Sequence, residues 1–300
     1  MKNNNLLTVL LAALLCLSLI ACGTADALNN SAGSTTGPVI SIEDADLPAV
    51  SGGDGEPVSS CAVSEDITAS LLQDTYPAGS QALTLVLENR GDETLTYGEE
   101  VSFEKYTDGV WRPVSTIDSY CFNSLAYFLE PHSVGTFTIS PWFLAEPLRP
   151  GLYRATGGEM WTGDDRGAAY TAWQVEFRVT EDARPEPAYA VFVPGQPLRH
   201  PENIPAYIVN TTGQTSSILL IPHLDYQNGL GQWEEVPYAE NVGFCGTSDP
   251  LPPEGMEVQE PVELLWGQLP SGRYRLSFDI TGTDPAARTT GGEFAIADFS

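Results

Sequence analysis

Residues 83–92 read LTLVLENRGD. Leucine recurs at every second position from Leu83 to Leu87, and the alternation stops at Asn89-Arg90-Gly91-Asp92, which is typical of a turn. Neighbouring side chains of a strand point to opposite faces of a sheet. We therefore predict a strand with one buried face here, and residues 173–180 (WQVEFRVT) show the same period.

Short alternating segments of this kind recur along the chain and are separated by turn signals. Examples of such signals are Asp108-Gly109, Arg149-Pro150-Gly151 and Gly163-Asp164. Outside the N-terminal apolar run, no window shows a convincing helical period. About seven short strands in roughly 115 residues are typical of a β-sandwich, so we expect an all-β fold.

The chain also repeats itself at a nearly constant spacing. Residues 148–154 (LRPGLYR) lie 121 positions before residues 269–275 (LPSGRYR), and Trp111 lies 122 positions before Trp233. The other matching pairs are Asn89 with Asn210, Cys121 with Cys245, and residues 176–179 with 293–296. A constant offset indicates internal duplication. We predict two tandem sandwich domains, residues 62–183 and 187–298, joined by the short, proline-stiffened link Arg184-Pro185-Glu186-Pro187.

The N-terminus has the layout of a secretory signal. Lys2 precedes an apolar run from Leu6 to Ala21, and Leu19-Ile20-Ala21-Cys22 resembles a bacterial lipobox. We predict a lipoprotein signal peptide at residues 1–21 and lipidation at Cys22. The alternatives are an ordinary signal peptide and an uncleaved anchor, although 16 apolar residues are short for a helix that needs about 20 to span a bilayer.

Residues 22–57 have the composition of a disordered acidic tether. Gly, Ser, Thr, Ala and Asp dominate this stretch, and it contains no Lys or Arg. Such a segment buries too little apolar surface to offset its chain entropy. Only residues 39–42 (VISI) are apolar enough to pack on the fold.

The charge balance narrows the range of partners. The chain has 13 Lys and Arg against 40 Asp and Glu, a formal net charge of −27. Nucleic-acid binding and electrostatic docking on anionic lipid both need clustered positive charge, so the composition argues against them. The lipid at Cys22 must then hold the protein, and we expect it on the extracellular face of the cell membrane.

The first repeat resembles the bacterial immunoglobulin-like domains of Gram-positive surface lipoproteins. The resemblance covers most of residues 66–180 and rests on LVLENRG (85–91), YGE (97–99), FEK (103–105), DGVW (108–111), LEP (129–131) and LRPGLYR (148–154). The second repeat keeps Trp233, LPP (251–253) and GRYR (272–275) but lacks the YGE element. The resemblance implies an immunoglobulin-like sandwich and a surface location, and it implies no catalytic residues.

The residues give no support for catalysis or for a resident cofactor. The carboxylate pairs are adjacent in sequence, and neighbouring strand residues point to opposite faces. The three His residues are dispersed, and no Gly-x-Ser-x-Gly elbow occurs. Calcium is the more serious ionic option, because residues 163–167 and Asp279–Asp284 occupy corresponding loops, yet neither has the spacing of a calcium loop. We predict no metal site.

The mature chain would keep three cysteines besides Cys22. They are Cys61, Cys121 and Cys245. A Cys61–Cys121 disulfide is one alternative, since the compartment is oxidising. The other is that these side chains are small, buried and unpaired, which the equivalence of Cys121 and Cys245 favours slightly.

The tryptophans divide into recurring and unique positions. Trp111 and Trp233 recur, so we expect them to pack the sandwiches. Trp142 and Trp161 do not recur, and Trp161 lies with Asp164 and Asp165 in a Gly-rich loop, residues 157–169, which is shortened in the second repeat. An exposed Trp in a loop stacks on a sugar ring or on an apolar patch of a partner, although Trp161 folding back over the core is an equal alternative.

These features favour a non-enzymatic surface lipoprotein that binds a protein or cell-envelope partner. One alternative is a carbohydrate-binding module with Trp161 and Trp142 as its stacking platform. A second is a protease inhibitor that presents residues 157–169 as a rigid loop.

Overall fold

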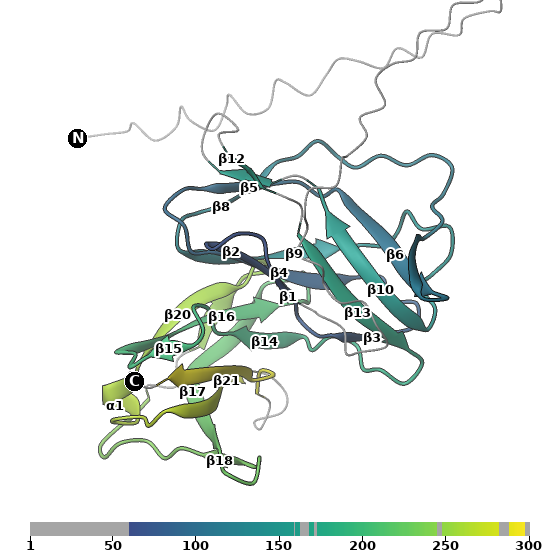
Figure 1. Cartoon of the computed structure of the whole chain (residues 1–300). Helices are drawn as coiled ribbons and strands as arrows, with labels where there is room; N and C mark the ends of the chain where they lie inside the picture. Colours follow the sequence, from purple (N-terminus) through teal and green to yellow (C-terminus); the bar gives the residue numbers. More distant parts are fainter. Residues whose placement is uncertain are drawn as a thin grey trace, which may run out of the picture. The chain divides into compact units, whose positions relative to one another are not determined.

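In the part of the chain that the computed structural model describes, all regular elements are β-strands except one four-residue helix, α1 (Val262–Leu265) (Figure 1). The structure describes residues 60–158, 160–162, 168–170, 173–244, 248–281 and 288–297. The predicted all-β sandwich fold is confirmed. The predicted signal peptide and tether, including Cys22, lie outside the described residues. Within them, no helix is long and apolar enough to cross a membrane.

The first thirteen strands form three sheets. Their orders are β1-β2-β4-β9, β3-β13-β10-β6-β7 and β12-β11-β5-β8, and all pairs are antiparallel except β3 with β13. The bounds are β1 Ser60–Ala62, β2 Ile67–Leu71, β3 Thr75–Pro77, β4 Leu83–Asn89, β5 Leu95–Tyr97, β6 Val101–Thr107, β7 Val110–Pro113, β8 Tyr127–Leu129, β9 Ser133–Ile139, β10 Gly151–Gly157, β11 Met160–Thr162, β12 Ala168–Tyr170 and β13 Gln174–Thr180. We call this set the first sandwich.

The remaining strands form the second sandwich. One sheet has the order β14-β16-β20, and the other has the order β15-β22-β21-β17-β18 with β19 also paired to β17. The bounds are β14 Tyr189–Phe192, β15 Leu198–Arg199, β16 Asn203–Asn210, β17 Ser216–Gln227, β18 Trp233–Glu235, β19 Ser248–Leu251, β20 Met256–Pro261, β21 Gly272–Ile280 and β22 Gly292–Ala297.

Each sandwich has its own core. In the first, Leu85 of β4 and Phe177 of β13 belong to one buried cluster, and both are fully buried. In the second, Ile208 of β16 and Phe278 of β21 belong to a separate buried cluster. Among the described residues, no ladder joins a strand of one set to a strand of the other. The boundaries 62–183 and 187–298 remain predictions.

Strand β4 is buried on both faces, whereas one buried face was expected. Its odd-numbered leucines point into the first core, and Val86 packs with Ala190, Tyr207 and Val209 of the second sandwich. The described strands all belong to one compact unit, Val50–Ser300. Thus the face of β4 that the sequence suggested would be exposed is covered by residues about a hundred positions later in the chain.

Three carboxylates complete this contact. Glu186 accepts hydrogen bonds from the Thr84 backbone N–H (2.7 Å) and from the Tyr76 hydroxyl (2.8 Å). Glu88 accepts one from the Gly195 N–H (2.8 Å), and Glu257 accepts one from the Val134 N–H (2.9 Å). Burial, followed by the charge of Glu186, raises the pKa of Tyr76.

Matching contacts recur at matching positions of the two sandwiches. The buried Asn89 amide donates to the carbonyls of residues 93, 129 and 130, and its oxygen accepts from the Gly91 N–H. Asn210 donates to residues 214, 251 and 252 and accepts from the Thr212 N–H. Each Asn ends a strand and ties its turn to a distant loop, which explains why both sequences need Asn there.

A second matching contact lies before the central strands. The Tyr153 hydroxyl donates to the Arg149 carbonyl (2.8 Å), and the Tyr274 hydroxyl donates to the Pro270 carbonyl (2.7 Å). A tyrosine bonded back to the backbone a few residues upstream is a feature of immunoglobulin-like sandwiches. Burial raises the pKa of Tyr274 to about 12.

Replacing either buried Asn tests whether the two corners are equivalent. We expect Asn89→Ala and Asn210→Ala each to lower the free energy of unfolding by about 1–3 kcal/mol, because each leaves buried backbone groups unpaired. Asn203→Ala, at an exposed position of β16, is the matched control and should change little. Chemical denaturation measures all three. A loss at one corner alone would contradict the equivalence.

Glu260 on β20 makes the second sandwich sensitive to pH. Its side chain is 9% exposed, and burial raises its pKa from 4.5 to about 7. The folded state therefore binds this proton more tightly than the unfolded state does. Consequently the free energy of unfolding falls as the pH rises from about 4.5 to about 7, and this contribution then levels off.

Glu260→Gln should remove that dependence. We expect the variant to melt several degrees above the parent at about pH 8 and close to it near pH 4.5, because an amide has no charge to desolvate. Thermal melts at the two pH values measure the effect, with the exposed Glu263→Gln as the control. Equal melting temperatures at the higher pH would refute this account of Glu260.

Candidate binding surface

Four rings of the first sandwich pack together, partly at its surface, and we call them the aromatic cluster: Tyr120, Phe122, Trp142 and Phe143. Phe143 is 1% exposed and belongs to the core. The other three rings surround it, with centroids 5.0 Å (Tyr120), 5.1 Å (Phe122) and 6.0 Å (Trp142) from its own. One buried ring therefore holds three surface rings in place.

Backbone pairing positions the two segments that carry these rings. The Ile117 N–H donates to the Phe143 carbonyl (2.9 Å), and the Ala145 N–H donates to the Ser115 carbonyl (2.9 Å). Trp142 and Phe143 lie in a turn closed by the Leu144 N–H, which donates to the Pro141 carbonyl (3.1 Å). In this turn Phe143 is buried and its neighbour Trp142 is exposed. Tyr120 and Phe122 come a few residues after Ile117 in the sequence, so this pairing brings them toward Phe143.

The cluster leaves much apolar surface open to solvent. Trp142 is 53% exposed and Tyr120 41%. Contiguous exposed apolar surface is typical of sites that bind proteins or ligands, and Trp and Tyr are the side chains that contribute most to such contacts. Trp142 was singled out from sequence as a candidate binding residue, and its exposure and neighbours suit that role.

Trp161 occupies a strand, not the open loop that was expected. It lies on β11 opposite Thr96 of β5, and Thr96 lies opposite Phe128 of β8. Directly paired residues share a face of the sheet, so these three form an outer row, on the face opposite the buried Leu95. Phe128 is 66% exposed, Trp161 is half-buried, and the Thr96 between them is 6% exposed. Trp142 thus belongs to the aromatic cluster and Trp161 to the outer row, and the platform of the two remains a prediction.

Part of the expected binding loop cannot be placed. Asp164 and Asp165 lie outside the described residues, as do the other residues between β11 and β12 (163–167). The protease-inhibitor alternative depends on this turn and is not tested by the described residues. The calcium alternative is not tested either, since residues 282–284 of its second loop also lie outside them. In the described part of the chain, no group of three His, Cys, Asp or Glu side chains is arranged to hold a metal ion.

The possible Cys61–Cys121 disulfide is not formed. Cys61 lies on β1, where its sulfur accepts a hydrogen bond from the Gln174 N–H (3.4 Å) and burial raises its pKa. Cys121 is exposed between Tyr120 and Phe122. Both thiols are free because Cys61 is held against β13 while Cys121 belongs to the aromatic cluster's loop. Cys245 lies outside the described residues.

The recurring tryptophans also differ from expectation. Trp111 and Trp233 are half-buried on β7 and β18 instead of packing the cores. Each lies against an arginine: Arg154 Cζ is 4.6 Å from the centroid of Trp111, and Arg275 Cζ is 4.8 Å from that of Trp233. These pairs are cation–π contacts at the outside of each sandwich.

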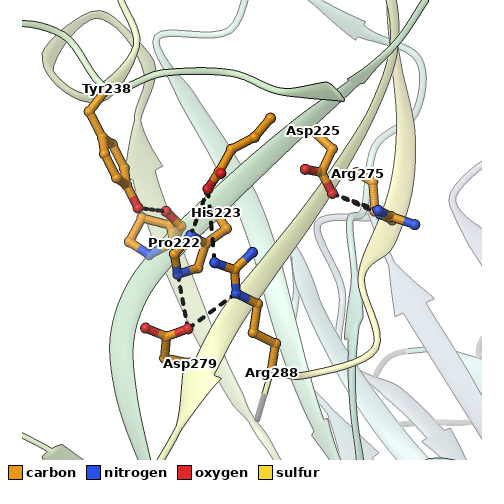
Figure 2. Close-up of polar contacts among 8 residues, drawn as sticks. Pro222, His223, Asp225, Tyr238, Arg275, Asp279 and Arg288 are labelled. Atoms are coloured by element: carbon orange, nitrogen blue, oxygen red, sulfur yellow. Dashed lines mark hydrogen bonds and ion pairs between the residues drawn. The ribbon is translucent and has the colours of Figure 1, made fainter. Parts of the chain in front are cut away.

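A polar cluster of the second sandwich surrounds the side chain of His223 (Figure 2). His223 on β17 has Nε2 2.9 Å from Asp279 Oδ1 and Nδ1 3.3 Å from Glu235 Oε1. Arg288 Nε lies 3.4 Å from the same Asp279 oxygen. The two imidazole nitrogens thus pair with carboxylates of β18 and β21, and the cluster ties β17, β18 and β21 together.

Sequence reasoning identified Trp142 but missed Tyr120, Phe122 and Phe128. The residues between β7 and β8 lack the alternation that marks a strand, so nothing indicated which of their side chains were exposed. The only indication in the sequence was the high frequency of aromatic residues, with four from Tyr120 to Phe128. Such density is equally compatible with a buried core.

Comparison with known proteins gives weak structural likenesses. No curated protein matches the sequence. Among solved structures, the YadV chaperone is 12% identical with a TM-score of 0.24, and the alignment covers 77% of this chain and 99% of that one. The E. coli chaperone DraB is 14% identical (TM-score 0.24; 76% and 96% covered), and red sea bream transglutaminase is 12% identical (TM-score 0.23; 79% and 32% covered). Likenesses this weak give no information about activity or partners.

A family model gives a more specific result for the first sandwich. The match covers residues 64–157, from the turn after β1 to the end of β10. It includes Asn89, the Tyr153 corner and the whole aromatic cluster. This part of the chain is similar to the family described as the bacterial Ig-like domain, and the first sandwich is accordingly supported as a bacterial Ig-like domain.

Proposed function

We propose that this protein is a non-enzymatic surface lipoprotein whose first sandwich binds a protein or cell-envelope partner through the aromatic cluster. The observation that carries the proposal is the solvent exposure of Trp142 and Tyr120 around the buried Phe143. An immunoglobulin-like domain suits such a role, because the rigid sheets can hold surface side chains in a fixed arrangement.

The proposal includes tandem immunoglobulin-like domains at residues 62–183 and 187–298. The matched contacts of Asn89 with Asn210 and of Tyr153 with Tyr274 support it, as does the 121-residue spacing of both pairs. Bonding of Glu186 at the junction to Thr84 supports limited hinge motion between the domains.

Removing the exposed rings tests the binding role. We expect Tyr120→Ser combined with Trp142→Ser to reduce retention of a discrete partner from a cell-envelope extract at least tenfold, because buried aromatic contacts carry much of the affinity of an interface. Leu230→Ser is the matched control, since Leu230 is 85% exposed on the second sandwich and should not affect retention. Quantitative pull-down compares the three proteins. Equal retention by the double variant and the parent would exclude the cluster as the binding face.

Anchoring would depend on Cys22. A thiol-linked and multi-chain lipid holds a protein where a single acyl chain cannot. We expect Cys22→Ala to move the protein from the membrane fraction to the soluble fraction and to abolish incorporation of a labelled fatty acid. Cys121→Ala is the control and should stay in the membrane. Membrane retention of the unlabelled Cys22→Ala protein would contradict lipid anchoring.

Carbohydrate binding is the second candidate, and the outer row favours it. Phe128 and Trp161 lie two strand spacings apart on one face, about 10 Å, with the polar Thr96 between them. Two rings held on a flat sheet could stack on separate sugars of an extended glycan.

Glycan retention should then depend on the outer row. We expect Trp161→Ala and Phe128→Ala each to weaken retention on immobilised glycans such as peptidoglycan, chitin or cellulose, with circular dichroism unchanged. Trp142→Ala serves as the control on the other aromatic group. Loss of retention with Trp142→Ala but not with Trp161→Ala would overturn the carbohydrate assignment of this row.

A further inference from the structure

The molecule uses one arrangement of aromatic ring, guanidinium and carboxylate twice. Arg154 lies over Trp111 and donates from Nε to Glu104 (2.8 Å). Arg275 lies over Trp233 and donates from Nε to Asp225 (3.1 Å), and Figure 2 shows this ion pair. In each case the cation is held on one side by a ring face and on the other by a carboxylate.

The aromatic cluster offers two of these three groups. The rings of Tyr120 and Trp142 are exposed, and the exposed Asp118 lies two residues before Tyr120 on the same segment. Glu99 is held beside the segment by a hydrogen bond from the Asn123 amide (2.6 Å). No Lys or Arg occurs from Pro113 to Leu148, which is the stretch that carries all four rings. The positive partner of the arrangement is therefore missing from this part of the sequence.

We propose that the aromatic cluster binds an Arg- or Lys-bearing segment of a partner protein, an inference that rests on the proposed function. The cationic side chains lie over the exposed rings of Tyr120 and Trp142 and pair with Asp118, while apolar side chains of the same segment cover the rest of the rings. The negative charge beside the rings favours a positively charged binding partner over a neutral or negatively charged one. A second copy of this chain, at a net charge of −27, would be repelled, and so would an anionic glycan.

A direct binding titration tests this assignment. The full-length protein, purified in a non-ionic detergent, is titrated into a fluorescein-labelled peptide of alternating arginine and leucine, and anisotropy is recorded. The same peptide with glutamate in place of arginine is the second probe. The variants are Tyr120→Ala with Trp142→Ala, and Asp118→Asn. Their matched controls are Leu230→Ala and Asp182→Asn, both at exposed positions, the second with the same loss of charge.

We expect the arginine peptide to bind the parent and both controls with the same affinity. The double variant should lose about tenfold in affinity and Asp118→Asn about threefold, and binding should weaken as ionic strength rises. Equal binding of the glutamate peptide, or equal affinity of the double variant and its control, would overturn the inference.

The same variants separate this inference from the proposed function. If the double variant loses the envelope partner but binds the arginine peptide as well as the parent does, the inference is wrong and the binding role stands. If neither the partner nor the peptide depends on the cluster, both are wrong.

Discussion

The alternation of side chains along an extended strand governs both the cores and the surfaces of this protein. The aromatic cluster is the exception, because Phe143 and its exposed neighbour Trp142 lie in a turn. Elsewhere, adjacent residues of a strand must face opposite sides of its sheet. On β5 the same rule buries Leu95 and directs Thr96 to the outer row with Phe128 and Trp161. The exposed rings are thus fixed by the packing of the residues beside them, which gives them the rigidity that recognition requires.

The contact between the sandwiches follows from the same alternation on β4. Leu85 and Leu87 face the first core, and Val86 between them is covered by Val209 and Tyr207. The carboxylates of Glu186, Glu88 and Glu257 then accept the backbone N–H groups at this contact. Buried N–H groups need acceptors, so acidic residues there contribute to the fold and do not serve only for solubility.

Much of the fold was accessible from sequence, because it depends on local patterns. Period-two leucines predicted β4, and the spacing of Asn89 and Asn210 anticipated two positions that make the same contacts. The second buried face of β4 was not accessible, since the residues that cover it lie about a hundred positions away. Trp111 was misjudged because recurrence suggested core packing, whereas its recurring role is to hold Arg154. Of the candidate binding surface, Trp142 was singled out from the sequence because it has no counterpart in the second repeat. The positions of Tyr120 and Phe122 depend on backbone pairing between two irregular segments, and such pairing leaves no periodic pattern in the sequence.

Site-specific photo-crosslinking on intact cells tests the binding role of the aromatic cluster most directly. A photoreactive phenylalanine replaces Trp142 in one protein and Leu230 in another, both of which present an exposed apolar side chain in the parent. The account predicts a discrete crosslinked protein from position 142, rich in Arg or Lys at the crosslinked segment, and none from position 230. The absence of a crosslink at 142, or the same products from both positions, would contradict it.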